Sequence, residues 1–475
     1  MKLKILQAEA RRRSFKTRMP FRFGVVTISA LERISLRLTV EDERGRLETG
    51  EAADFMVPRW FSKDPAGTPA SDVANLATSV RRAAQRALNA SPRSATVFAH
   101  WNALQAETFE PVQTDPDAAL VAGFGVALVE RALMDAATRL AQMSFHQALR
   151  SDLFFFDPAA LIPALKGWEL KDSLPAQARQ ALKVRHTVGF LDVLAAKDVV
   201  QDAAADGLPR SLEEDLTHHG LCAFKLKLSG QPTPDAERLS AIAKLLLTHV
   251  DPEALRISVD ANEQYADLGA LAETLAQLSA SPAGRTLLSR LAFIEQPVPR
   301  RLVAAIADDP ARERIEKIAP LLLDEGDTHT LAFRNAIGAG WRGVSVKTCK
   351  GVFRAFLNRG LVEQSRGQLM LSAEDLTSPP LTALVQDLSL AASLDLPDTE
   401  KNAHHYFRGL DNCSAAEQAC ALRAYPHLFA RQEQSVQVRI RNGLMDLTDF
   451  AQQGFGGHGL AWDELDQPCF VETAS

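Results

Sequence analysis

Short apolar runs that end at or beside a charged side chain recur through the middle of the chain. The clearest are Phe224–Leu228, Arg256–Asp260, Leu291–Glu295, Leu321–Asp324 and Gly343–Lys347. Continuous apolar stretches of this length, separated by enough residues for a loop and a helix, are typical of buried parallel strands. The pattern therefore predicts a series of strand–helix units.

Three further runs extend the series at both ends. They cover residues 183–188, 369–373 and, more weakly, 399–407. Eight strands alternating with helices is the number that closes a barrel. In such a barrel the carboxyl ends of the strands converge on one rim, where charged residues indicate chemistry rather than stability.

The flanking segments show other patterns. Residues 20–55 alternate apolar and polar side chains around a turn at residues 42–45, as in an antiparallel meander. Helical spacing follows over residues 72–90 and 117–149. We expect an α/β protein with an α+β capping domain over residues 1–150 and a barrel over residues 151–408. The C-terminal segment, residues 409–475, is expected to pack back on the cap.

Composition and charge limit which partners and which cellular location the protein can have. The 475 residues carry a net charge of -6 and no long basic run, which argues against a nucleic-acid surface. The beginning of the chain lacks the apolar stretch of a signal peptide, and no window reaches the roughly 18 apolar residues of a membrane span. The five cysteines are scattered and form no CxxC motif, as expected of reduced thiols. We expect a soluble cytoplasmic protein.

Three acids end consecutive predicted strands: Asp260, Glu295 and Asp324. Carboxylate oxygens are preferred ligands of Mg²⁺, and three of them from neighbouring strand ends can meet one ion while leaving room for a substrate. Such an ion can bind a substrate carboxylate and stabilise the negative charge that develops when a neighbouring C–H proton leaves. We expect these residues to hold Mg²⁺.

Lysines stand on either side of this predicted metal site. Lys225 and Lys227 share one strand face because side chains alternate with period two, and Lys347 ends a later strand. A lysine can act as a base at neutral pH when burial or nearby positive charge lowers its pKa. The sequence thus predicts proton removal next to a carboxylate.

Several motifs stand in a fixed order along the chain. The strongest are Lys225–Lys227, Val259–Asn262, Ile294–Pro297, Asp324–Glu325 and Val346–Gly351, with weaker ones at Phe21–Phe23, Gly50–Ala52, Glu130–Asp135, Gly443–Leu444 and Gly454–Gly456. Together they resemble the enolase superfamily, in the branch of muconate lactonizing enzymes, dipeptide epimerases and o-succinylbenzoate synthases. The resemblance implies a cap made from both termini over a (β/α)7β-type TIM barrel, Mg²⁺ at the barrel mouth, a small carboxylate substrate and a homo-oligomer.

The resemblance also implies roles for the lysines. Lys227 would be the base on one face of the substrate, Lys347 the acid or base on the other, and Lys225 would hold the substrate carboxylate. The shared step forms an enediolate; dehydration, epimerisation or racemisation, and cycloisomerisation all remain open. Because the sixth strand ends in Lys347 and not in a His–Asp pair, the lactonizing branch is favoured over the mandelate-racemase branch.

Five polar residues follow the predicted strand ends. Asn262 and Glu325 are expected to orient the ligands or to make local loop hydrogen bonds. Lys350 is expected either to support Lys347 or to be exposed. Glu374 and Asp375 are adjacent, so strand alternation predicts that only one of them faces inward.

Arg59, within the segment Asp54–Phe61, is a further candidate. By resemblance this segment is a specificity loop, where Arg59 would neutralise a second anionic group of the substrate; the alternative is an ordinary surface arginine. His404 and His405 either line the pocket or are structural. The region around them lacks a clear Asp-x-Asp motif, which weakens a dipeptide substrate.

Two other classes of function remain open. The first is a different metal-dependent barrel enzyme, such as an aldolase or sugar isomerase, which would use histidine ligands or a Schiff-base lysine. The second is a catalytically silent relative that acts as a scaffold or binding protein. An enzyme is favoured because all six predicted metal-binding and catalytic residues are present: Lys225, Lys227, Asp260, Glu295, Asp324 and Lys347.

Overall fold

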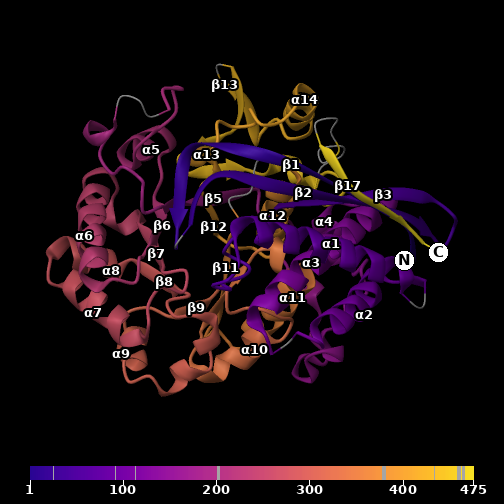
Figure 1. The fold of residues 1–475 in the computed structure, drawn as a ribbon, viewed down its shortest axis with the longest axis horizontal. Coiled ribbons are helices and arrows are strands. Elements are labelled where there is room, and N and C mark those ends of the chain that lie inside the picture. Colours follow the sequence, from indigo (N-terminus) through magenta and orange to yellow (C-terminus); the bar gives the residue numbers. More distant parts are fainter. Residues whose placement is uncertain are drawn as a thin grey trace.

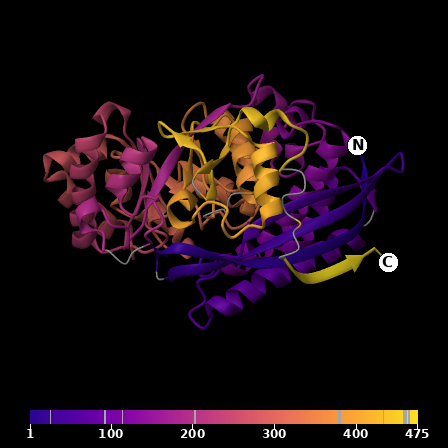
Figure 2. The same cartoon turned by 90° about the horizontal axis from the view of Figure 1, so that it is seen from above.

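A closed barrel and an antiparallel cap sheet make up the protein (Figure 1). The structure is a computed structural model, and it describes residues 1–24, 26–90, 93–112, 114–200, 204–376, 381–432, 434–456, 462 and 466–474. The cap sheet and its helices lie along one side of the barrel (Figure 2).

Eight parallel strands form the barrel, which confirms the predicted fold class. They are β5 (Ala181–Val188), β6 (Ala223–Lys227), β7 (Arg256–Asp260), β8 (Leu291–Glu295), β9 (Leu321–Leu323), β10 (Gly343–Val346), β11 (Met370–Ala373) and β12 (Asp398–Lys401). Each pairs with the next, and β12 pairs with β5 to close the cylinder. Strands such as β6 are buried along their whole length because they have side chains inside the barrel and helices outside it.

Helices follow the strands and cover the outside of the barrel. They are α5 (Leu212–His219), α6 (Pro232–His249), α7 (Leu268–Ser279), α8 (Pro282–Ser289), α9 (Arg312–Glu316), α10 (Ala332–Ala336), α11 (Val352–Gln364), α12 (Thr382–Ser393) and the short α13 (Ala403–Tyr406). Side-chain caps fix several of their starts: Ser211, Asp267 and Ser281 accept hydrogen bonds from the first turns of α5, α7 and α8.

The cap sheet has the order β17-β1-β2-β3 and is antiparallel. Its strands are β1 (Leu3–Phe23), β2 (Val26–Asp42), β3 (Leu47–Phe55) and β17 (Gln467–Thr473), with the short β4 (Ser94–Ala95) beside β1. Four helices belong to the same region: α1 (Pro69–Asn89), α2 (Val97–Phe109), α3 (Pro116–Leu140) and α4 (Phe145–Arg150).

The helical pattern over residues 117–149 is divided between α3 and α4. Gln142 adopts a left-handed conformation with φ of 54°, and Ser144 caps α4 through a capping box with Gln147. Because a left-handed residue cannot continue a right-handed helix, the chain turns here although the apolar spacing continues.

The C-terminal segment reaches both layers. After α14 (Ala415–Ala424) and the hairpin of β13 (Phe429–Gln432) and β14 (Ser435–Val438), β15 (Ile440–Arg441) and β16 (Leu444–Asp446) extend the barrel sheet at β5. The last strand, β17, pairs with β1, so both chain ends lie at the cap (Figure 1).

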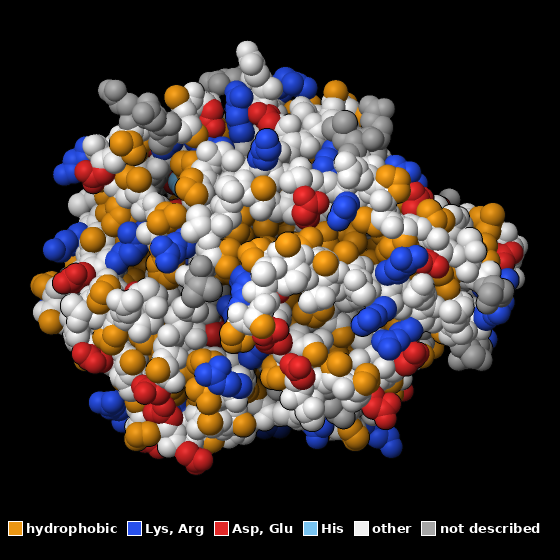
Figure 3. All heavy atoms as spheres, in the orientation of Figure 1, with side chains coloured by type: hydrophobic (Ala, Val, Ile, Leu, Met, Phe, Trp, Pro, Cys, Tyr) orange, Lys and Arg blue, Asp and Glu red, His pale blue; other side chains and the backbone are white. Residues whose placement is uncertain are grey.

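Charges of both signs are interspersed over the face in Figure 3, in keeping with the modest net charge. Within the described part of the chain, no helix has the length and apolar character to cross a membrane.

Candidate active site

A cavity of about 40 Å³ lies at the carboxyl ends of the barrel strands, under the cap. The cap contributes an apolar wall of Phe21, Phe23, Val57 and Trp60. The barrel contributes Lys225, Lys227, Asn262, Lys347, Asp375, Leu376, Glu400 and Asn402. The structure therefore places all three predicted lysines at one cavity.

Lys225 is surrounded by carboxylates inside the barrel. Its Nζ lies 2.7 Å from Glu295 Oε1, 2.9 Å from Glu400 Oε2, and 3.1 Å from both Glu374 Oε2 and Asp260 Oδ2. Burial alone would lower the pKa of Lys225, but these carboxylates outweigh it and raise the pKa well above its ordinary value. The side chain is thus a fixed positive charge at neutral pH.

Lys227 faces the same cavity two residues further along β6. Its Nζ donates to Asp260 Oδ2 at 2.5 Å and to Asn262 Oδ1 at 2.9 Å. The backbone N–H of Asn262 donates to Asp260 Oδ1, and its side-chain amide donates to Glu325 Oε1 at 3.0 Å. Asn262 thus links the Lys227–Asp260 pair to Glu325 through hydrogen bonds.

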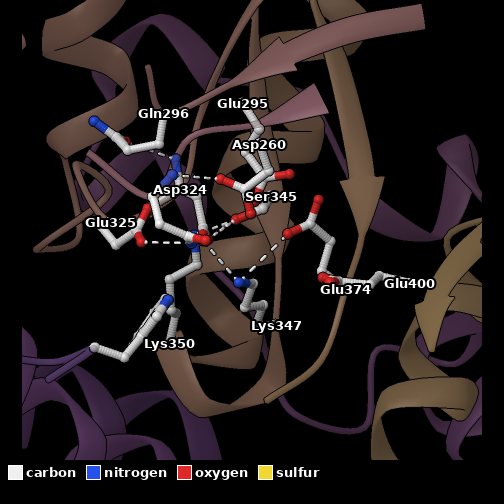
Figure 4. A network of polar contacts seen from close by, with 12 residues as sticks. Asp260, Glu295, Gln296, Asp324, Glu325, Ser345, Lys347, Lys350, Glu374 and Glu400 are labelled. Atoms are coloured by element: carbon white, nitrogen blue, oxygen red, sulfur yellow. Dashed lines mark hydrogen bonds and ion pairs between the residues drawn. The ribbon is translucent and has the colours of Figure 1, made fainter. Parts of the chain in front are cut away.

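Lys347 lies at the end of β10, on another wall of the cavity. Its Nζ is 2.7 Å from Asp324 Oδ2 and 3.4 Å from Glu374 Oε2 (Figure 4). The same Nζ lies 4.8 Å from the centre of the Trp60 ring, a cation–π contact with the cap. Burial lowers the pKa of Lys347, but Asp324 and Glu374 outweigh it and raise the pKa well above normal.

Lys350 is buried behind Lys347 and is not exposed. Its Nζ donates to Ser345 Oγ at 2.7 Å and lies 3.5 Å from Asp324 Oδ1. The Ser345 hydroxyl in turn donates to Asp324 Oδ1 (Figure 4). Asp324 is thus held by two lysines and a hydroxyl, and these lysines keep its pKa below the usual range although burial acts in the opposite direction.

Three carboxylates are placed to share a cation. One oxygen from each of Glu295, Asp324 and Glu374 lies within 4.8 Å of the others, and all three residues are buried. Burial and the nearby charges of Asp260 and Glu374 raise the pKa of Glu295 well above normal. Its Oε2 accepts no hydrogen bond from the described residues. Such a donor set suits a hard cation.

Backbone strain is concentrated just past β7 and β8. Asn262, Glu263 and Gln296 have φ angles of 44°, 72° and 31°. Residues other than glycine rarely adopt this region, and where they do the surrounding contacts hold them. Here Gln296 Oε1 accepts the backbone N–H groups of Asp324 and Gly326, which ties the end of β8 to the loop after β9.

Both acids after β11 belong to the site, which corrects the prediction that only one faces inward. Glu374 reaches Lys225 inside the barrel, whereas Asp375 lines the cavity and pairs with Lys401 at 2.7 Å. The alternation rule fails because β11 ends at Ala373, so neither acid lies within the strand. Burial raises the pKa of Asp375 to about 6.

Arg59 is not among the residues that line the cavity, although its neighbour Trp60 is. Its guanidinium donates to the carbonyl oxygens of Asp64 and Gly67, and its backbone N–H donates to Asp72. With 14% of its side chain exposed and these partners, Arg59 is not the ordinary surface arginine of the alternative interpretation either, while its neighbour Trp60 provides the contact with Lys347.

Sequence reasoning missed Glu400 as a member of the site. It lies on β12, accepts from Thr187 Oγ1 at 2.6 Å and pairs with Lys225. Lys225, Lys227 and Lys347 overcome the effect of burial and lower the pKa of Glu400 to about 2. The sequence pattern that could have indicated Glu400 is Asp398-Thr-Glu400, because residues two apart on a strand share one face. Both acids point into the barrel, where Asp398 pairs with Arg185 and Glu400 with Lys225.

Comparisons with known proteins identify the fold. Neither a protein-family model nor a curated protein sequence matches the chain. One similar solved structure is an enolase from Bradyrhizobium complexed with magnesium and mandelic acid. The alignment spans 98% of the present chain and 97% of the Bradyrhizobium chain, with a TM-score of 0.59 and 17% sequence identity. Another is a dipeptide epimerase from Enterococcus faecalis V583 complexed with Mg and the dipeptide L-Leu-L-Tyr. The alignment spans 96% of the present chain and 100% of the epimerase chain, with a TM-score of 0.57 and 14% sequence identity.

A third similar structure is described as a putative mandelate racemase/muconate lactonizing enzyme from Roseovarius nubinhibens ISM complexed with magnesium. The alignment spans 99% of the present chain and 100% of that chain, with a TM-score of 0.56 and 14% sequence identity. The resemblance found in the motifs is therefore confirmed at the level of the fold. The chain has the barrel-and-cap fold of solved enolase-superfamily structures.

Proposed function

We propose that the protein is a Mg²⁺-dependent enzyme of the enolase superfamily that removes the proton next to a substrate carboxylate. The observation that carries the proposal is the placing of Lys227 and Lys347 in one cavity, on β6 and β10. In the strand order β6-β7-β8-β9-β10 these two strands are four steps apart, which is half of the eight-stranded circle. A substrate bound between them presents opposite faces to the two amines.

The lysines differ in their surroundings, and this suggests how they divide the work. Lys225 keeps its charge among four carboxylates and suits the binding of a substrate carboxylate. Lys347, whose Nζ lies 2.7 Å from Asp324 Oδ2, is the proposed acid or base on one face of the substrate. Lys227, which is positioned by Asp260 and Asn262, is the proposed base on the opposite face.

Glu295 and Asp324 are the proposed core of the metal site. Asp260, the third ligand predicted from the sequence, has Oδ2 bound by Lys227 and Lys225 and Oδ1 bound by the Asn262 N–H. Glu374 offers an oxygen close to those of Glu295 and Asp324, so the geometry supports it as an additional ligand. When bound there, a hard divalent cation supplies positive charge that offsets the carboxylates around Lys347 and stabilises an enediolate.

The apolar side chains that the cap contributes to the cavity indicate which class of substrate fits. Phe21, Phe23, Val57 and Trp60 cover the cavity with apolar surface. Carboxylic acids that carry an apolar or aromatic group beside the reactive carbon fit this wall best. Enolase-fold structures with mandelic acid or L-Leu-L-Tyr bound are consistent with this class.

Deuterium exchange tests the proposal. A panel of such acids is incubated with the protein and MgCl₂ in D₂O, and deuterium at the carbon next to the carboxylate is measured by NMR. The wild type is expected to exchange at least one acid. Lys227→Ala and Lys347→Ala should each slow the exchange by about 10² or more, as expected for the loss of a general base or acid. Lys244→Ala, at an exposed position on α6, is the matched control and should exchange normally.

Other outcomes would point elsewhere. Exchange that survives in both cavity variants would contradict the assignment of the lysines. Mg²⁺ binding measured by calorimetry without exchange across the panel would favour a catalytically silent relative. Trapping of a substrate adduct by borohydride would favour a Schiff-base enzyme of the aldolase class.

A further inference from the structure

A second cluster of potential metal ligands lies outside the barrel, beneath α5. It consists of His186 on β5, Asp215 and His219 on α5, and His404 on α13. The neighbours of His186 along the strand, Arg185 and Thr187, reach Glu374 and Glu400 inside the barrel. Strand alternation therefore turns His186 to the outer face, away from the carboxylates of the candidate active site.

The spacing of these groups is that of a metal site. One ligand atom each from His186, Asp215 and His404 lies within 4.8 Å of the other two. His186 Nδ1 lies 3.0 Å from His404 Nε2, near the separation of about 3.3 Å expected for two ligands about 2.05 Å from a tetrahedral Zn²⁺. His186 also approaches Asp215, with its Nε2 3.9 Å from Asp215 Oδ2.

His219 offers a fourth ligand from the same helix as Asp215. The two residues are four positions apart, so they share one face of α5, and His219 Nε2 lies 3.7 Å from Asp215 Oδ1. The ring centres of His219 and His404 are 5.0 Å apart. Three imidazoles and a carboxylate make a four-ligand set of the kind that binds Zn²⁺.

Protonation states fit this use. Burial lowers the pKa of His186, lowers the pKa of His404 well below normal, and lowers that of His219 to about 4. These imidazoles are therefore neutral near pH 7, as metal ligands must be. Asp215 is fully buried, and its Oδ1 accepts no hydrogen bond from the part of the chain that the structure describes.

His405 supports the cluster from behind. Its Nδ1 lies 2.6 Å from Asp215 Oδ2, so it can fix the carboxylate while Oδ1 remains for a ligand. A cavity of about 30 Å³, lined by His219, His404, Val438, Ile440 and Met445 among others, adjoins the cluster. Two of the four potential ligands, His219 and His404, therefore line a cavity, which Lys401 also lines.

We propose that His186, Asp215, His219 and His404 form a second metal site that takes a Zn²⁺-class ion. Nitrogen ligands favour Zn²⁺ and its transition-metal neighbours over Mg²⁺, which prefers oxygen. The site is separate from the cavity that holds Lys227 and Lys347, and the proposal stands independently of the proposed reaction.

Zn²⁺ titration of the full chain tests the site. The protein is treated with a chelator, dialysed and titrated with Zn²⁺ by calorimetry in a large excess of MgCl₂, which competes with Zn²⁺ for the carboxylates of the candidate active site. One equivalent of Zn²⁺ is expected to bind. Co²⁺ in its place should give the visible absorption of a tetrahedral nitrogen–oxygen site. His404→Ala and Asp215→Asn should each weaken Zn²⁺ binding at least tenfold.

His427→Ala is the matched control. His427 also faces an aspartate, with Nδ1 2.8 Å from Asp449 Oδ1, but it is on the surface and apart from the cluster. Its loss should leave Zn²⁺ binding unchanged. Circular dichroism checks that each variant is folded. Absence of Zn²⁺ binding and of the Co²⁺ spectrum in the wild type would refute the site, as would full Zn²⁺ binding by both folded variants.

Discussion

Glu130 on α3 is a carboxyl group in a fully buried position. The backbone N–H of Val352, at the start of α11, donates to its Oε1. Burial raises the pKa of Glu130 to about 8, and Arg131 and Arg354 offset only part of that effect. At neutral pH this side chain is therefore largely protonated.

Glu130 should make stability depend on pH. Between its ordinary pKa near 4.5 and its folded-state value near 8, the folded protein binds more protons than the unfolded chain. The free energy of unfolding should therefore fall as pH rises through this window, by at most about 1.4 kcal/mol per pH unit from this group. Urea unfolding at several pH values between 5 and 8 measures the slope.

Glu130→Gln removes the titration but keeps an oxygen for the Val352 N–H. The free energy of unfolding of this variant should change less steeply with pH than that of the wild type. Parallel curves for the two proteins would show that Glu130 ionises normally in the folded state.

Individual site residues were predictable from the sequence where they lie at the end of a strand, because the strand fixes which way the side chain points. Lys225, Lys227 and Lys347 were found in this way, and they meet at one cavity. Residues beyond a strand end were harder, as the pair Glu374 and Asp375 shows, because a loop has no fixed alternation. The contact of Trp60 with Lys347 joins distant segments, and no local pattern contained it.

At the scale of elements, α3 packs against α1 through a glycine. A Cβ at Gly125 would lie 2.3 Å from the backbone oxygen of Ser79. Gly125→Ala should therefore lower the free energy of unfolding by about 1–3 kcal/mol through overpacking. This effect should exceed the gain of about 1 kcal/mol that alanine offers in a helix. Chemical denaturation measures the difference.

Gly123→Ala in the same helix is the comparison. A Cβ there would meet the Phe109 ring at 3.2 Å, a side-chain contact that can adjust more easily than backbone. Its cost should be clearly smaller than that of Gly125→Ala. Equal effects of the two substitutions would argue against close backbone packing at residue 125.

The barrel strands β6 to β11 were predictable because each is a short buried run that ends near a charge. The eighth strand was predicted only weakly, over residues 399–407, because β12 reads Asp-Thr-Glu-Lys; it ends at Lys401, and α13 begins at Ala403. The cap was predicted less completely, since β1 begins at Leu3, well before the expected meander. The break between α3 and α4 was missed because the apolar spacing continues through it. The left-handed backbone of Gln142, with φ of 54°, is unusual for glutamine and cannot be predicted from the residue type.

At the scale of the whole molecule, a buried ion network joins the two ends of the chain. Asp466 lies 2.9 Å from Arg13 Nε and 2.8 Å from Arg33 Nη2, and both arginines also contact Glu417. Asp466→Ala would leave buried guanidinium groups with fewer partners. The free energy of unfolding should fall by about 3–5 kcal/mol, measured by urea denaturation.

Glu253→Ala provides the control for this prediction. Glu253 pairs with Arg290 at the surface, where 77% of its side chain is exposed. Exposed pairs contribute about 1 kcal/mol or less, so this variant should remain close to the wild type. A similar small loss for Asp466→Ala would mean that the network does not hold the ends together.

The pairing of β1 with β17 has a consequence during synthesis. Residues 7–12 of β1 are synthesised more than 450 residues before their partner residues 467–473. Until then that edge of the sheet has no neighbour, and a bare strand edge is a template for pairing with another chain. The emerging polypeptide is therefore vulnerable to misassembly along this edge until residues 467–473 have been made.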